Sequence, residues 1–114
     1  AVRIKKKFSG EIIAICMGPA SASDVLKQVL ALGADGAYLV SDKAFAGADT
    51  YATARVLSET IRKIGGIDLV ICGKQSTDSS TSQIPSSVAA FLDIIAVNNV
   101  VSCEAEKDGI RCRR

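Results

Sequence analysis

The chain alternates between continuous apolar runs and segments whose apolar residues recur at helical spacing. The continuous runs are Glu11–Met17, Ala37–Val40 and Ile67–Cys72. Runs without polar alternation are typical of strands covered on both faces, as in a parallel sheet. We therefore predict three strands of one parallel sheet.

Segments with helical spacing lie before, between and after these runs. The predicted helices are one that ends at Phe8, one that opens at Ser21, one that begins at Asp49 or Thr50, and one from about Thr81 to Leu92. An S-x-x-D capping signal at Ser21–Asp24 marks the second start, and Gly33 marks its end. Gly65-Gly66 ends the third helix in the same way.

The last part of the chain reads as two strands joined by a turn at Lys107–Gly109, because Asp-Gly between strand-like runs is a strong hairpin signal. Strands that alternate with helices predict an α/β fold, a parallel sheet with flanking helices. The C-terminal β-hairpin follows that sheet. With 114 residues, the chain has the length of a single domain, residues 1–114.

Composition excludes several classes of protein. No apolar run approaches the ~18 residues of a membrane helix. The net charge of +2 is too small to indicate a nucleic-acid partner, and solvated termini explain the basic clusters at Lys5–Lys7 and Arg111–Arg114. The four cysteines form no C-x-x-C pair and the chain has no His, so we expect reduced, cytosolic thiols rather than a zinc site or disulfides.

Topology points to one edge of the sheet as the candidate site. In parallel α/β folds, ligands bind beyond the carboxyl ends of the strands. The segments there are Met17–Pro19, Asp42–Thr50 and Gly73–Gln83. Met17 and Cys72 end their runs, so each either packs at the core's edge or supports a ligand ring.

The segment Gly73–Gln83 is long and polar for a connection between a strand and a helix. It could hold a phosphate, since it combines a glycine, a cation, several hydroxyls and a helix N-terminus. The side chains that would do so are Lys74, Ser76, Thr77, Ser79, Ser80 and Thr81. Equally, Ser80 and Gln83 fit an S-x-x-Q capping box that needs no ligand. The spacing matches neither a Walker loop nor G-x-G-x-x-G.

Asp49 and Thr50 carry a similar ambiguity, because a helix cap explains Asp49 while a pair facing the same crevice would bind a ligand. The chain lacks His, and no pair of carboxylates falls at a plausible catalytic position. Hydrolysis or acyl transfer by this chain is therefore not expected, and we assign no catalytic residue.

The pattern G-[KR]-Q-x-x-D-x-x-T-x-Q resembles that of electron transfer flavoprotein beta subunits, and "FAGADTYATARVL" and "DLVICGKQ" strengthen the likeness. The residues that match this pattern are Gly73, Lys74, Gln75, Asp78, Thr81 and Gln83. The resemblance implies a Rossmann-like fold similar to adenine nucleotide alpha hydrolases. It also implies a cytoplasmic heterodimer with an electron transfer flavoprotein alpha subunit, which carries electrons from a dehydrogenase partner such as acyl-CoA dehydrogenase.

In that family the beta subunit binds AMP or, in bifurcating members, FAD, and the flavin rather than the protein performs the redox chemistry. The expected cofactor-binding residues are Met17, Asp49, Thr50, Cys72, Gly73, Lys74, Gln75, Ser76, Thr77, Asp78, Ser79, Ser80, Thr81 and Gln83. The chain departs from the family by Ser80 in place of an acidic residue and by Pro85 in place of glycine.

The resemblance further implies an internal fragment of a beta subunit, without the family's first strand. A sheet lacking that strand would expose apolar side chains, so we expect self-association. Two alternatives remain open at this point: a universal-stress-type adenine-nucleotide module without a redox role, and a purely structural domain whose serine segment is only a cap.

Overall fold

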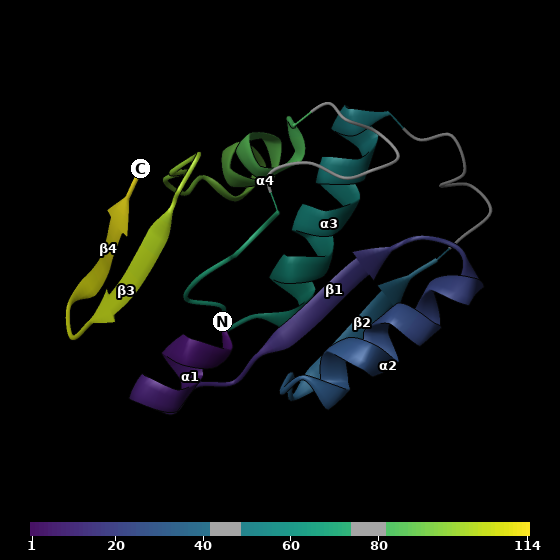
Figure 1. Ribbon diagram of the computed structural model, residues 1–114. Helices are drawn as coiled ribbons and strands as arrows, with labels where there is room; N and C mark the ends of the chain where they lie inside the picture. Colours follow the sequence, from purple (N-terminus) through teal and green to yellow (C-terminus); the bar gives the residue numbers. More distant parts are fainter. Residues whose placement is uncertain (42–48, 74–81) are drawn as a thin grey trace. The chain divides into compact units, whose positions relative to one another are not determined.

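The computed structural model describes residues 1–41, 49–73 and 82–114. Contacts divide the chain into two compact units, one of Ala1–Ala46 with Glu104–Gly109 and one of Gly47–Cys103 with Ile110–Arg114. Figure 1 shows the elements, and each unit is described by itself. The single domain predicted over the whole chain stays a prediction.

The first unit is built on two parallel strands, as the apolar runs predict. Strand β1 (Ile13–Met17) pairs with β2 (Gly36–Val40), in a register from Ile13 opposite Gly36 to Met17 opposite Val40. Helix α2 (Ser23–Ala31) connects them and packs on both strands. The strand–helix–parallel-strand unit confirms the α/β class.

Helix α2 ends where Gly33 was expected to end it. Gly33 has a φ of 126°, which an L side chain rarely adopts. A Cβ at this position would also lie 3.4 Å from Cγ2 of Val2, in helix α1 (Val2–Phe8). Leu26 is the buried apolar residue of α2, and its neighbour Val25 is exposed.

The predicted cap at the start of α2 is wrong. A 3₁₀ turn, η1 (Ala20–Ala22), precedes the helix, and Ala22 stands at the N-cap position without a side-chain capping bond. The amide of Ala22 donates to the Pro19 carbonyl at 2.9 Å. An N-cap residue usually has extended dihedrals. Ser21 lies inside the 3₁₀ turn, which continues directly into the helix, so Ser21 cannot act as its cap.

The second unit centres on helices α3 (Thr50–Ile64) and α4 (Ile84–Leu92), which pack together. Their contact uses small side chains, since Ala54 and Ser58 of α3 and Val88 and Ala89 of α4 are all buried. The Ser58 hydroxyl donates to the Ala54 carbonyl at 2.7 Å, so its burial leaves no polar atom unpaired.

Ring and guanidinium contacts add to this packing. The rings of Tyr51 and Phe91 meet edge to face with centroids 5.2 Å apart. Arg62 donates a hydrogen bond to the Phe91 carbonyl, which lies near the end of α4. The end of α3 was predicted correctly, because Gly65 and Gly66 both have positive φ, 69° and 65°.

The third predicted strand is wrong, because Ile67–Cys72 follows α3 without forming one. Ile67, Leu69 and Ile71 are exposed along this segment. A strand needs a neighbouring backbone for its ladder of hydrogen bonds, and an apolar run supplies only side chains.

The predicted C-terminal hairpin is confirmed. Strand β3 (Ser102–Glu106) pairs with β4 (Gly109–Arg113) across the turn at Lys107–Asp108. Among the described residues, none of the helices has the length and apolar character needed to cross a membrane.

Candidate functional site

The predicted site divides between residues that the structure describes and residues that it does not. Eight of the expected cofactor contacts lie outside the described residues: Lys74, Gln75, Ser76, Thr77, Asp78, Ser79, Ser80 and Thr81. Those described are Met17, Asp49, Thr50, Cys72, Gly73 and Gln83.

Met17 belongs to the first unit and lies where predicted, at the carboxyl end of β1. It is partly exposed there. The amide of the next residue, Gly18, donates to the Val40 carbonyl at 3.1 Å, which extends the pairing with β2 past the last residue of β1. The other five described residues belong to the second unit.

Asp49 acts as a helix cap. It has extended dihedrals before α3, and its Oδ1 accepts a hydrogen bond from the Ala52 amide at 2.8 Å. This bond satisfies one of the amides left free at a helix start, and the negative charge interacts favourably with the helix dipole. Thr50 is the first residue of the helix. The capping interpretation of Asp49 is confirmed, and a ligand role for the pair stays a prediction.

Cys72 ends the apolar run and Gly73 begins the polar segment, and both residues are exposed. Surrounding protein atoms nevertheless desolvate the sulfur and raise the pKa of the Cys72 thiol. A Cβ built on Gly73 would meet no atom within 4 Å in the described structure. The backbone at Gly73 is therefore open to close approach.

Gln83 does not take the place that the capping box requires. The box needs Gln83 inside the first turn, but α4 begins at Ile84, and Gln83 is its N-cap without a side-chain capping bond. Pro85 is the second residue of α4 and fits the first helical turn, where the amide that proline lacks would have no partner within the helix. Ser82, with a φ of 54°, also breaks the helix that was predicted from Thr81.

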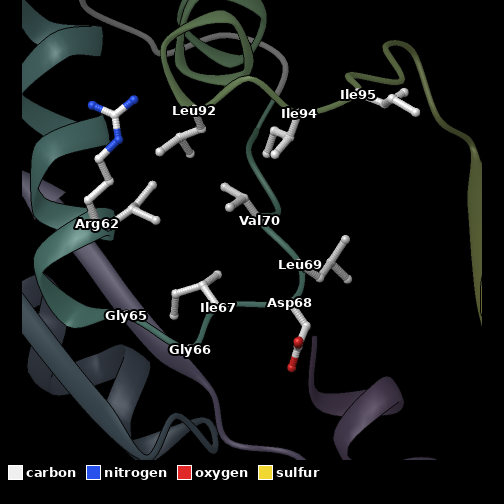
Figure 2. Close-up of a pocket in the computed structure, with 11 residues that line it drawn as sticks. Arg62, Gly65, Gly66, Ile67, Asp68, Leu69, Val70, Leu92, Ile94 and Ile95 are labelled. Atoms are coloured by element: carbon white, nitrogen blue, oxygen red, sulfur yellow. The ribbon is translucent and has the colours of Figure 1, made fainter.

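A groove of about 390 Å³ in the second unit was not predicted from the sequence. It lies beside the C-terminal end of α3 and is lined by Ile61, Arg62, Gly65, Gly66, Ile67, Asp68, Leu69, Val70, Leu92, Ile94 and Ile95. In Figure 2, Leu92, Ile94 and Val70 point toward a common space. The sequence feature that forms part of this groove is the apolar run after Gly65 and Gly66, which was predicted to be a strand.

The lining of the groove includes none of the described residues that were expected to bind a cofactor. Asp49 lies at the opposite end of α3, whose 15 residues span about 22 Å. The Arg62 guanidinium bonds to Glu59 at 2.8 Å and to the Phe91 carbonyl, and in Figure 2 it points away from Asp68. The lining is otherwise apolar. In the part of the chain that the structure describes, no cluster of three or more His, Cys, Asp or Glu could hold a metal.

Comparison with known proteins identifies the family. The family model described as "Electron transfer flavoprotein domain" matches residues 1–114. The electron transfer flavoprotein subunit beta of Thermoanaerobacterium thermosaccharolyticum is 46% identical over 114 residues, which is 100% of this chain and 44% of that protein. Protein FixA of Azotobacter vinelandii is 42% identical, over 100% of this chain and 43% of its own length.

A third relative is named as part of a larger assembly. The caffeyl-CoA reductase-Etf complex subunit CarD of Acetobacterium woodii is 44% identical over 93% of this chain and 41% of that protein. The chain thus spans less than half the length of these relatives. Since the family model matches the chain from its first residue to its last, the chain belongs to the electron transfer flavoprotein family.

Proposed function

We propose that this chain is the nucleotide-binding part of an electron transfer flavoprotein beta subunit and that it holds AMP or FAD. In this proposal the nucleotide phosphates lie against the polar segment Gly73–Gln83 and the start of α4. A bound flavin would supply the electron transfer, and the residues of this chain would bind and orient the cofactor.

The observation that carries the proposal is the start of α4. Gln83 makes no side-chain capping bond there, in contrast to Asp49 at α3. A helix N-terminus presents amide donors and the positive end of the helix dipole, which favour an anion. The polar segment precedes this helix, and Gly73 at its beginning leaves room for a ligand to approach the backbone.

A phosphate fits the start of α4 better than that of α3. At α3, the Asp49 carboxylate already accepts from the Ala52 amide, so a second anion would meet a like charge. At α4, Ile84 and Ser86 supply amides in the first turn, whereas Pro85 has none. The proposal therefore gives Asp49 the role of positioning α3 and assigns phosphate binding to the other helix.

The proposal includes an alpha subunit as partner and an acyl-CoA-type oxidoreductase as electron donor or acceptor. Its support lies in the relatives, whose names include a caffeyl-CoA reductase complex subunit and an acryloyl-CoA reductase electron transfer subunit. It also places the protein in the cytoplasm, since reducing compartments keep thiols free and all four cysteines are free in the structure. Co-purification of a tagged protein with a flavin-containing alpha subunit tests this part.

Calorimetric titration of the full-length protein with AMP and with FAD tests the cofactor. We expect binding that Lys74→Ala weakens, because the substitution removes the cation of the polar segment. Lys107→Ala, which removes a lysine from the hairpin turn, is the matched control and should bind normally. A ligand at 100 times its Kd should also raise the free energy of unfolding by about 2.7 kcal/mol. The proposal is contradicted if neither AMP nor FAD binds.

A further inference from the structure

Two cysteines face each other across the C-terminal hairpin. Strands β3 and β4 have five residues each and are joined by the two-residue turn Lys107–Asp108. Cys103 is the fourth residue before this turn and Cys112 is the fourth residue after it. In an antiparallel pair, residues at equal distance from a two-residue turn lie opposite each other on the same face.

The contact between the two side chains agrees with this count. Hydrogen bonding and charge from Cys112 help to raise the pKa of the Cys103 thiol, as expected for neighbouring side chains, and both residues are exposed. The two cysteines also belong to the same unit of the structure. Neither cysteine has a role in the cofactor site proposed above.

The backbone geometry of a hairpin permits a bond between such residues. Directly opposite residues in an antiparallel pair have Cα atoms about 4.5 Å or about 5.5 Å apart, depending on whether the pair is hydrogen-bonded. Disulfides span Cα separations of roughly 4.4–6.8 Å. Both kinds of pair lie within this range, so a bridge between Cys103 and Cys112 requires little movement of either strand.

The raised pKa of the Cys103 thiol lowers its reactivity toward oxidants. Desolvation, the hydrogen bond to Cys112 and repulsion from its sulfur together raise the pKa of the Cys103 thiol. The thiolate is the form that attacks oxidants, so a raised pKa keeps this residue less reactive near neutral pH. Once one sulfur of the pair is oxidised, the other is already in contact with it.

We propose that Cys103 and Cys112 form a dithiol that hydrogen peroxide converts reversibly into an intrachain disulfide. One thiolate attacks a peroxide oxygen and becomes a sulfenic acid, with release of one water after proton transfer. The second thiol attacks the sulfenic sulfur, forms the S–S bond and releases a second water. The two thiols lose two electrons and two protons in total, and the peroxide is reduced to two waters.

Intact-mass and peptide analysis after limited peroxide treatment of the full-length protein tests this site. We expect Cys103 and Cys112 to become resistant to alkylation together, with a mass lower by two hydrogen atoms. Tryptic cleavage after Lys107 separates the two cysteines in sequence, so a disulfide-linked peptide pair identifies the bridge directly. Dithiothreitol should restore both thiols.

Single substitutions provide the controls. Cys103→Ser and Cys112→Ser should each abolish the linked peptides and leave the remaining cysteine to proceed to sulfinic acid. Cys16→Ser, in β1, should leave the linked product unchanged. The proposal is overturned if the two thiols of the unsubstituted protein oxidise independently, or if either one pairs with Cys72 or with a second copy of the chain.

Discussion

Asp49 is the residue whose single contact has the clearest energetic consequence. Its carboxylate accepts the Ala52 amide at the start of α3, and nothing else in the described contacts replaces that bond. We expect Asp49→Ala to lower the free energy of unfolding by about 1 kcal/mol. Urea denaturation followed by circular dichroism measures this change. Asp49→Ser, which keeps an acceptor oxygen, should retain most of the stability, and equal losses in both variants would contradict a capping role.

Asp35 makes the stability of the first unit depend on pH. Its carboxylate accepts from the Lys5 ammonium at 2.5 Å and from the Ile12 amide at 2.8 Å, and these hydrogen bonds lower its pKa. Because the pKa of Asp35 is lower in the folded state than in the unfolded state, its contribution to the free energy of unfolding is fully present above the unfolded-state pKa. It is lost as the pH falls through the folded value.

We therefore expect Asp35→Asn to lower the Tm modestly at neutral pH, with a difference from the unsubstituted protein that shrinks in acid. Thermal unfolding monitored across acidic to neutral pH measures the effect. Asp24→Asn is the control, since Asp24 is exposed and its Oδ1 is 4.0 Å from Lys27. A constant difference at all pH values would show that the charge of Asp35 is not responsible.

Residue-scale prediction succeeded where the local sequence alone determines the conformation. Gly33 and Asp49 were assigned correctly, because a positive φ favours glycine and an exposed helix start favours an acceptor oxygen. Ser21 was assigned wrongly as a cap residue, and Gln83 stands at the N-cap of α4 without the capping-box bond that was one of its two open interpretations. A 3₁₀ turn contains Ser21 and leads into α2, and α4 begins only at Ile84, and the capping pattern alone reveals neither feature.

At the scale of elements, the contact between α3 and α4 depends on small side chains. Ala54 is 0% exposed, so a larger side chain there has no space. We expect Ala54→Leu to destabilise the second unit by about 1–3 kcal/mol through overpacking, as measured by chemical denaturation. Arg55→Leu adds a leucine at the neighbouring exposed position and should have a much smaller effect. Similar losses in both variants would mean that leucine perturbs the helix itself rather than its packing.

Helix and hairpin predictions held because their hydrogen bonds are local. The bounds of α3 and of the β3–β4 hairpin follow from capping residues, glycines and a two-residue turn. A strand in a parallel sheet instead needs a distant partner, which explains why the run Ile67–Cys72 was misassigned. The same reason made the groove beside α3 unpredictable, since its walls come from α3, the run after it, and the residues after α4.

At the scale of the whole molecule, exposed apolar side chains favour association. Ile95 is 92% exposed and Val101 is 78% exposed, and both belong to the second unit. We expect this chain to self-associate at high concentration, and Ile95→Lys to shift it toward monomer in sedimentation velocity. Gln28→Lys adds the same charge at an exposed polar position of α2 and should leave association unchanged. A monomeric unsubstituted chain would contradict this expectation.

The segment Ile67–Cys72 has a consequence for the rate at which its amide hydrogens exchange with solvent. Helical amides of α3 exchange only when the helix opens, whereas amides outside any helix or ladder are exposed to solvent in the folded state. Deuterium uptake at Ile67–Cys72 should therefore be fast in the isolated chain and slow in any assembly that supplies a neighbouring strand. The deuterium uptake at these six positions would then report whether the run has paired with a neighbouring strand. Slow uptake in the isolated chain would show that such a strand is already paired with it.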